Sequence, residues 1–228
     1  MVNLPSSPKT AVLSSSASTP PSDLTTQTII SHIIETIQVI LEQIWYYRSV
    51  YPKESFQKQR SFQLQVYSNF HPGVKQYLKE TSEQILDLLK RGKLKRLFID
   101  LYFDDKKFES YAFSFTNSIL FDYIRQKCPI QFEETFKEGL LYASLQSLLF
   151  SVIGRLSRMP ELKESPEFKI LVSADEDTFN DMIKDQNWIL EKTDLSDTHT
   201  HIRDVDVKEF KEVNLGYLNI KGYVGRRG

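Results

Sequence analysis

Residues 97–115 contain two short stretches in which every second side chain is apolar, separated by a charged turn. The first stretch lies within "LKRLFIDLYF", the turn is "DDKK", and the second stretch ends in "YAFSF". This pattern predicts a β-hairpin in a half-buried antiparallel sheet, because alternate residues of a strand point to the same face. The apolar positions on that face are Leu97, Ile99, Leu101, Phe103, Tyr111, Phe113 and Phe115.

The segment before this hairpin begins with a helical pattern. Eight apolar side chains between Ile30 and Trp45 recur at steps of three and four residues, which predicts a core helix that begins near Thr25 or Thr26. Pro52 ends this helix, because the residue before a proline is pushed out of the helical region. The alternating stretch 56–67, "FQKQRSFQLQVY", then predicts an extended arm or strand.

Two further helices are predicted. His71-Pro72 begins one, since proline is well tolerated in a first turn, and Gly92 ends it. Residues 132–157 form the other, which has no charge from Gly139 to Gly154. A helix that is apolar nearly all round is either central to the domain or shared with an oligomer interface. It is too short and too rich in serine to span a bilayer, so we expect no membrane association.

The two ends of the chain show less periodicity of apolar residues. Residues 1–25 are rich in serine, proline and threonine and predict a disordered tail. Near the other end, "FKILVSA" predicts a buried strand. Residues from about 176 to 228 mix acidic loops with short strand-like pieces, "NWIL", "VDVKEF" and "YLNIKGYV", and we expect them to depend on the rest of the domain for order.

Charge and motifs argue against several classes of function. The formal net charge is -1, so the field of the whole protein gives no reason for binding bare nucleic acid, and we expect contact with DNA only indirectly. A single cysteine, Cys128, excludes an internal disulfide framework and fits the cytosol or nucleus. The chain has no P-loop, dinucleotide fingerprint, Gly-x-Ser-x-Gly or Cys-x-x-Cys motif, so we expect no enzyme activity and no cofactor. His199 and His201 could begin a metal site, but no third ligand is indicated, and a solvated loop is the simpler interpretation.

The stretch "QIWYYRSVYPKESFQ" resembles the end of the first core helix in HORMA-domain proteins, where a tyrosine, an arginine and a Tyr-Pro pair precede a phenylalanine. The downstream "HPGVKQYLKET" and "NWIL" are more similar to the accessory subunits of DNA polymerase zeta than to the spindle-checkpoint branch. The resemblance covers residues 27–225. It implies an α+β HORMA domain over 26–228, with three core helices packed on a mainly antiparallel sheet and a C-terminal safety belt at about 176–228.

The resemblance also implies sites and partners. A proline-containing peptide of the polymerase zeta catalytic subunit would be trapped under the belt, in a pocket that includes Tyr77 and Trp188, although both could instead be core aromatic residues. The C-terminal domain of the scaffold translesion polymerase would bind Val207, Lys221 and Tyr223. The family pattern has leucine and glutamine where this chain has Val207 and Lys221.

The function implied is that of a noncatalytic nuclear adaptor in the tolerance of DNA damage, with a HORMA dimer possible. The alternative is a spindle-checkpoint or meiotic HORMA adaptor that binds the closure peptide of another partner.

Overall fold

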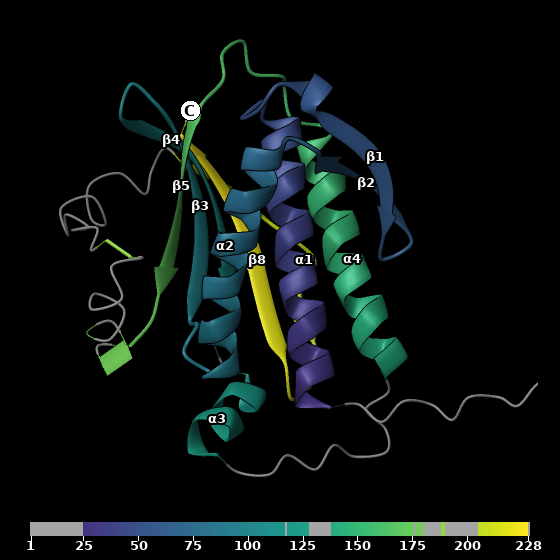
Figure 1. The fold of residues 1–228 in the computed structure, drawn as a ribbon, viewed down its shortest axis with the longest axis vertical. Helices are drawn as coiled ribbons and strands as arrows, with labels where there is room; N and C mark the ends of the chain where they lie inside the picture. Colours follow the sequence, from purple (N-terminus) through teal and green to yellow (C-terminus); the bar gives the residue numbers. More distant parts are fainter. Residues whose placement is uncertain are drawn as a thin grey trace, which may run out of the picture.

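The computed structural model describes residues 25–116, 118–127, 138–175, 177–178, 180, 188–189 and 205–227. The elements in chain order are α1 (Thr26–Tyr47), η1 (Lys53–Ser55), β1 (Phe56–Ser61), β2 (Leu64–Asn69), α2 (Pro72–Lys90), β3 (Arg96–Phe103), β4 (Lys106–Ser114), α3 (Ile119–Gln126), α4 (Glu138–Leu156), β5 (Glu167–Ser173), β6 (Val205–Glu209), β7 (Val213–Asn214) and β8 (Asn219–Arg227). Three long helices lie side by side in front of the main sheet, with α1 between α2 and α4 (Figure 1).

Helix α1 begins where the sequence predicts. The side chain of Thr25 caps it by accepting a hydrogen bond from the backbone N–H of Thr28 at 3.1 Å. Because α1 has a neighbour on each side and the sheet behind it, its burial extends beyond one stripe and includes the polar residues Glu42 and Gln43. The prediction of a core helix is therefore confirmed.

Strands β1 and β2 form a separate hairpin that packs on α1. Phe62 and Gln63 make the turn with positive φ angles of 48° and 57°. The amide of Gln43 bonds both backbone groups of Tyr67: its Nε2 donates to the carbonyl at 2.9 Å, and its Oε1 accepts from the N–H at 3.1 Å. A helix side chain thus pairs with β2 as another strand would.

The main sheet has the order β5-β3-β4-β8-β6, and all its neighbouring strands are antiparallel. The predicted hairpin is β3 and β4, joined by Asp104 and Asp105 with φ angles of 47° and 60°. Two of the three strand-like pieces predicted near the C-terminus, "VDVKEF" and "YLNIKGYV", contain β6 and most of β8, whereas "NWIL" lies partly outside the described residues. The prediction that "FKILVSA" is a buried strand is wrong, because β5 is an edge strand in which no residue is fully buried.

Strand β8 approaches β4 closely at one glycine. Gly222 lies opposite Phe113 in the ladder, and the ring of Phe113 stacks on that of Phe210 with centroids 5.8 Å apart. A Cβ atom at position 222 would lie 2.8 Å from the Phe113 ring and 3.1 Å from the Phe210 ring. The absence of a side chain at this position lets β8 and the two rings share the space.

A buried ion pair ties the end of α1 to the sheet. The guanidinium of Arg48 donates two hydrogen bonds to the carboxylate of Glu109 on β4, at 2.8 and 3.1 Å, and both side chains are fully buried. Arg48 also donates to the carbonyl of Pro160 at 2.8 Å, and the hydroxyl of Tyr111 donates to Glu109. The network therefore connects α1, β4 and the segment that leads into β5.

Helix α4 has both a core face and an exposed face. Its buried residues are Leu141, Leu145, Leu148, Leu149, Val152 and Leu156, whereas Phe150 is 68% exposed. The sequence left two interpretations of this helix, a central position in the domain or a place in an oligomer interface. The buried face fits a central position, while Phe150 remains on the surface. Contrary to the expectation from its sequence, α4 is long and apolar enough to cross a membrane, a test that core helices also pass.

Three expectations lie wholly or partly beyond the described residues. They are the disordered tail, of which only residue 25 is described, the histidine pair at 199 and 201, and most of the belt before Val205. The short helix α3 was not predicted at all.

Candidate peptide-binding edge

Strand β5 forms one end of the main sheet, and β3 is its only strand neighbour in the part of the chain that the structure describes. In an antiparallel pair, alternate residues turn their N–H and C=O groups away from the partner strand. The outer side of β5 thus carries a row of backbone donors and acceptors to which another strand could add. In Figure 1, β5 lies at the side of the sheet, away from the β1–β2 hairpin.

An aromatic cluster lies at the start of this edge. Phe168 on β5 contacts Trp45 of α1, with ring centroids 5.4 Å apart, and Tyr77 of α2, at 5.8 Å with the rings nearly perpendicular. Tyr51 contacts both Trp45 and Phe168. Edge-to-face contacts of this kind favour a fixed arrangement of rings. The aromatic cluster is therefore adjacent to a strand edge that has no partner strand among the described residues.

Tyr77 has the mixed environment expected of a residue at a binding surface. Its side chain is 39% exposed, although its ring contacts Trp45 and Phe168. Burial raises the pKa of its hydroxyl, while a hydrogen bond with Thr81 lowers it. The structure thus places the ring of Tyr77 beside Phe168 of β5, and its role in binding a peptide stays a prediction.

Trp188 is half-buried and packs against the hydrophobic core, and the next residue, Ile189, is 94% exposed. Within the described residues, no ring contact joins Trp188 to the cluster around Tyr77. The residues directly before it, 181–187, are outside the described part of the chain. Its role in a pocket remains a prediction.

Two members of the cluster were missed from the sequence as site residues. Trp45 was assigned to the apolar face of the first helix and Phe168 to a buried strand. The indole N–H of Trp45 is buried and has no hydrogen-bond partner among the described residues. The available signal was the position of Trp45 within "QIWYYRSVYPKESFQ", the stretch that resembles HORMA-domain proteins. Its contact with Phe168 could not be predicted, because the two residues are far apart in the sequence.

The residues predicted for a second surface share one face of the sheet. Lys221 and Tyr223 are alternate residues of β8, and Val207 of β6 lies opposite Gly225, the next residue of that series. Val207 and Tyr223 are exposed, and Lys221 forms an ion pair with Glu212 at 3.6 Å. The structure brings these three residues to the side of the sheet opposite its buried face. Their function stays a prediction.

The described residues contain no cluster of three or more His, Cys, Asp or Glu side chains that could hold a metal ion. The predicted absence of a metal at His199 and His201 is not tested, because both lie outside those residues. The side chains gathered at the β5 edge are mainly aromatic, which suits binding of a polypeptide segment.

Known proteins resemble this chain in sequence and in fold. Residues 30–120 match the HORMA domain family. The chain is 24% identical over 149 residues to "DNA polymerase zeta subunit 2" of Drosophila melanogaster, covering 64% of this chain and 70% of that protein. It is 25% identical over 211 residues to "Mitotic spindle assembly checkpoint protein MAD2B" of Homo sapiens, covering 88% and 92%.

Solved structures share the fold at low sequence identity. A chain in the crystal structure of the mitotic checkpoint complex matches with a TM-score of 0.67 and 17% identity, covering 91% of this chain and 99% of that chain. Caenorhabditis elegans HTP-1 bound to the HIM-3 closure motif matches with a TM-score of 0.57 and 13% identity, covering 89% and 91%. The fold is therefore the HORMA fold, and the resemblance to HORMA-domain proteins found in the sequence is confirmed.

Proposed function

We propose that this chain is the noncatalytic HORMA adaptor subunit of translesion DNA polymerase zeta. In this role it holds a peptide of the catalytic subunit and bridges it to the scaffold translesion polymerase in the nucleus. The observation that carries the proposal is the outer edge of β5, which pairs with no strand among the described residues, beside the exposed ring of Tyr77. The similarity to DNA polymerase zeta subunit 2 supports the choice of partner.

The peptide adds to β5 as a further strand. Backbone hydrogen bonds to the outer side of Glu167–Ser173 provide sequence-independent affinity, and side-chain pockets provide specificity. A proline in the peptide packs against aromatic rings such as Tyr77 and Trp188. Proline costs the peptide little here, because its ring already restricts the backbone that binding must order.

We infer that the connection after β5 retains the peptide. The chain leaves the sheet at β5 and enters it again at β6, which is the opposite edge. Four inter-strand spacings place these edges ~19 Å apart, so residues 176–204 join opposite sides of the sheet. A connection that must open before the peptide leaves lowers the dissociation rate more than it raises the association rate, as a permanent subunit requires.

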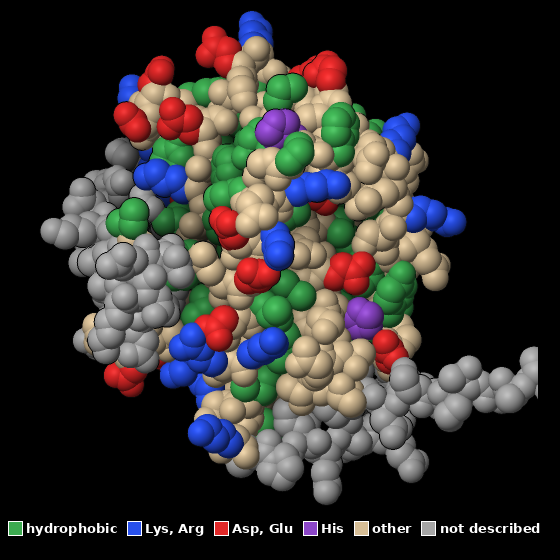
Figure 2. Space-filling view, in the orientation of Figure 1, with side chains coloured by type: hydrophobic (Ala, Val, Ile, Leu, Met, Phe, Trp, Pro, Cys, Tyr) green, Lys and Arg blue, Asp and Glu red, His purple; other side chains and the backbone are tan. Residues whose placement is uncertain are grey.

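The outer face of β6 and β8 binds the C-terminal domain of the scaffold polymerase through Val207, Lys221 and Tyr223. Exposed apolar and aromatic side chains on adjacent strands suit a protein partner. On the face drawn in Figure 2, side chains of both charges are interspersed, and the formal net charge is -1. Contact with DNA is accordingly indirect, through the polymerase subunits.

The alternative function is a spindle-checkpoint or meiotic adaptor that uses the same edge for another closure peptide. The structural similarity to a chain of the mitotic checkpoint complex and to HTP-1 bound to a closure motif favours it. Affinity capture of the full chain from nuclear extract, followed by mass spectrometry, separates the two functions. We expect recovery of the polymerase zeta catalytic subunit. Recovery of checkpoint activators in its place would support the alternative.

A direct test measures a catalytic-subunit peptide by calorimetry on the full chain. Trp188→Ala removes a large aromatic anchor, and such a hot spot is worth about 2 kcal/mol or more, roughly thirtyfold in Kd. Phe150→Ala is the matched control, because it removes an exposed aromatic ring on α4, which lies across the helix layer from β5 (Figure 1). Equal affinity of wild type and a folded Trp188→Ala variant would show that Trp188 is only a packing residue.

A further inference from the structure

A cleft lies along α4, apart from both surfaces described above. Its volume is about 630 Å³, within the range of ~300–1,000 Å³ usual for small-ligand sites. One wall consists of side chains from Gln146 to Arg158, in α4 and the turn after it, and the remaining lining comes from Leu64 at the start of β2 and Lys211 between β6 and β7. None of the residues proposed for the two partner surfaces lines it.

Hydrogen bonds hold these three segments around the cleft. Gln146 Nε2 donates to the carbonyl of Phe62, in the turn of the β1–β2 hairpin, at 2.7 Å. On the other side, the backbone N–H of Lys211 donates to Ser151 Oγ at 3.0 Å. The walls are therefore held by the fold itself, which lowers the cost of ordering the site when a ligand binds.

The charged side chains that line the cleft are all cations. They are Arg155, Arg158 and Lys211, and no aspartate or glutamate is among the described residues of the lining. None of the three forms an ion pair within the part of the chain that the structure describes. Glu212, the acid next to Lys211 in the chain, pairs instead with Lys221 at 3.6 Å. The C-terminal end of α4 is equivalent to about half a negative charge, which three full positive charges outweigh, so the cleft favours an anion.

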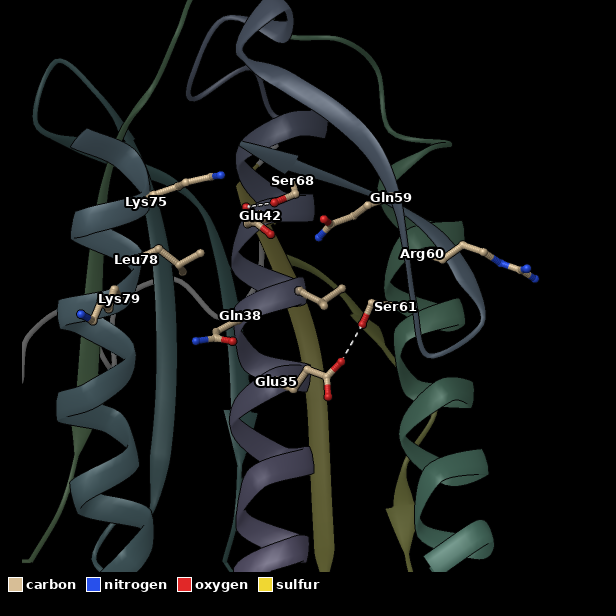
Figure 3. Close-up of a pocket in the computed structure, with 11 residues that line it drawn as sticks. Glu35, Gln38, Glu42, Gln59, Arg60, Ser61, Ser68, Lys75, Leu78 and Lys79 are labelled. Carbon is tan, nitrogen blue, oxygen red and sulfur yellow. Dashed lines mark hydrogen bonds between the residues drawn. The ribbon is translucent and has the colours of Figure 1, made fainter. Parts of the chain in front are cut away.

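The cleft between α1, α2 and the hairpin has no such preference (Figure 3). Charges of both signs line it, namely Glu35, Glu42, Arg60, Lys75 and Lys79. These charges can compensate one another, so they give no reason to expect a ligand of either sign. Of these two clefts, only the one along α4 has charge of a single sign.

Apolar side chains lie beside the cations of the α4 cleft. Phe150 lines it with a ring that is 68% exposed, and Leu64 from the hairpin is half-buried. A free inorganic ion leaves both side chains in contact with water. An anionic group at the end of a side chain covers them with its stem, which adds apolar burial to the ionic contacts.

We propose that the α4 cleft binds the phosphate group of a phosphorylated side chain from a partner polypeptide. A phosphate monoester carries about −1.5 to −2 charge at pH 7 and three strong acceptor oxygens, which suits three unpaired cations. Arg155 and Arg158 lie in one turn, in which the N–H of Arg158 donates to the carbonyl of Arg155 at 3.1 Å, and guanidinium groups bind phosphate through paired hydrogen bonds. A carboxylate fits less well, because it has a single charge and two oxygens.

The test uses the full chain labelled with 15N and the small probe acetyl-phosphoserine methylamide. The comparisons are acetyl-serine methylamide, acetyl-glutamate methylamide and inorganic phosphate. We expect saturable chemical-shift changes at residues 146–158 and around Lys211 with the phosphoserine probe, none with the serine probe, and weaker binding of glutamate and of inorganic phosphate. Arg155→Gln should weaken binding about tenfold, since a hydrogen bond to a charged group is worth at least that factor. Lys90→Gln, which removes an exposed cation of α2 outside the cleft, should leave binding unchanged.

Three results with the probes would overturn the proposal: glutamate that binds as tightly as phosphoserine, inorganic phosphate that binds as tightly as phosphoserine, or shifts that map away from the cleft. Equal effects of Arg155→Gln and Lys90→Gln would also overturn it, because binding would then follow the total charge and not the cleft. If Arg155→Gln does not fold, Lys211→Gln replaces it under the same criterion. The outcome is independent of the proposed function, since peptide binding at β5 can be measured on the same samples.

Discussion

The buried pair of Arg48 and Glu109 gives the sharpest prediction about stability. Replacing Arg48 by methionine keeps much of the side-chain volume but leaves the carboxylate of Glu109 without its counter-charge at a fully buried site. Breaking a buried ion pair on one side costs about 3–5 kcal/mol of unfolding free energy. The carbonyl of Pro160 also loses its donor, which adds about 1 kcal/mol.

Urea unfolding measures this cost. With an m-value of about 3 kcal/mol/M, a combined loss of ~5 kcal/mol lowers the midpoint by ~1.7 M. Arg91→Met is the matched control, because Arg91 pairs with Asp87 on the exposed surface of α2 and such pairs contribute ~0–1 kcal/mol. The double variant Arg48→Met/Glu109→Leu should recover part of the loss, because no unpaired charge remains.

The reasoning fails if Arg48→Met lowers the unfolding free energy no more than Arg91→Met does. It also fails if adding Glu109→Leu to Arg48→Met lowers the unfolding free energy by as much as Glu109→Leu does in the wild-type protein. In either case the pair would not be coupled as its geometry indicates.

Other predictions concern α4, the two partner surfaces and alkaline pH. Leu149→Glu should unfold the protein because Leu149 is fully buried, whereas Phe150→Glu should stay folded; circular dichroism checks both, and light scattering shows whether the folded variant changes an oligomer. Tyr77→Ala should weaken the catalytic-subunit peptide at least tenfold, and Tyr223→Ala should weaken only the scaffold-polymerase domain, by calorimetry; loss of both partners in one folded variant would contradict separate surfaces. Burial raises the pKa of Tyr217 to about 12, so the folded state binds its proton more tightly than the unfolded chain. Its stabilising effect is complete below pH 10 and is lost as the pH rises to about 12, and Tyr217→Phe should show a smaller loss of stability over that range than wild type does.

The local elements were largely predictable from the sequence, because their signals are short-range. The apolar periodicity up to Trp45 gave α1, although the helix ends at Tyr47, before the predicted stop at Pro52. The charged turn at Asp104 and Asp105 gave the β3–β4 hairpin. Helix α3 was missed because eight residues are too few for periodicity to stand out. Its one signal was Ser118, a favourable residue before a helix, yet its side chain bonds Asn219 and not the helix.

The candidate site was less predictable, because its parts come from distant segments. The resemblance supplied Tyr77, but the contact of Trp45 with Phe168 joins residues that are separated by more than a hundred positions. Within the described residues, the position of β5 at an edge depends on the strand order, since β8 pairs with β4 and not with β5. No local pattern distinguishes those two pairings.

The close packing at Gly222 has a consequence for how sequences with this fold can vary. The free space at position 222 is set by two rings, those of Phe113 and Phe210, so substitutions at these three sites are coupled. In a library randomised at all three positions and selected for folding, glycine should persist wherever both phenylalanines do. Alanine at 222 should be recovered only together with a smaller residue at 113 or 210, so evolutionary drift at this place requires paired changes.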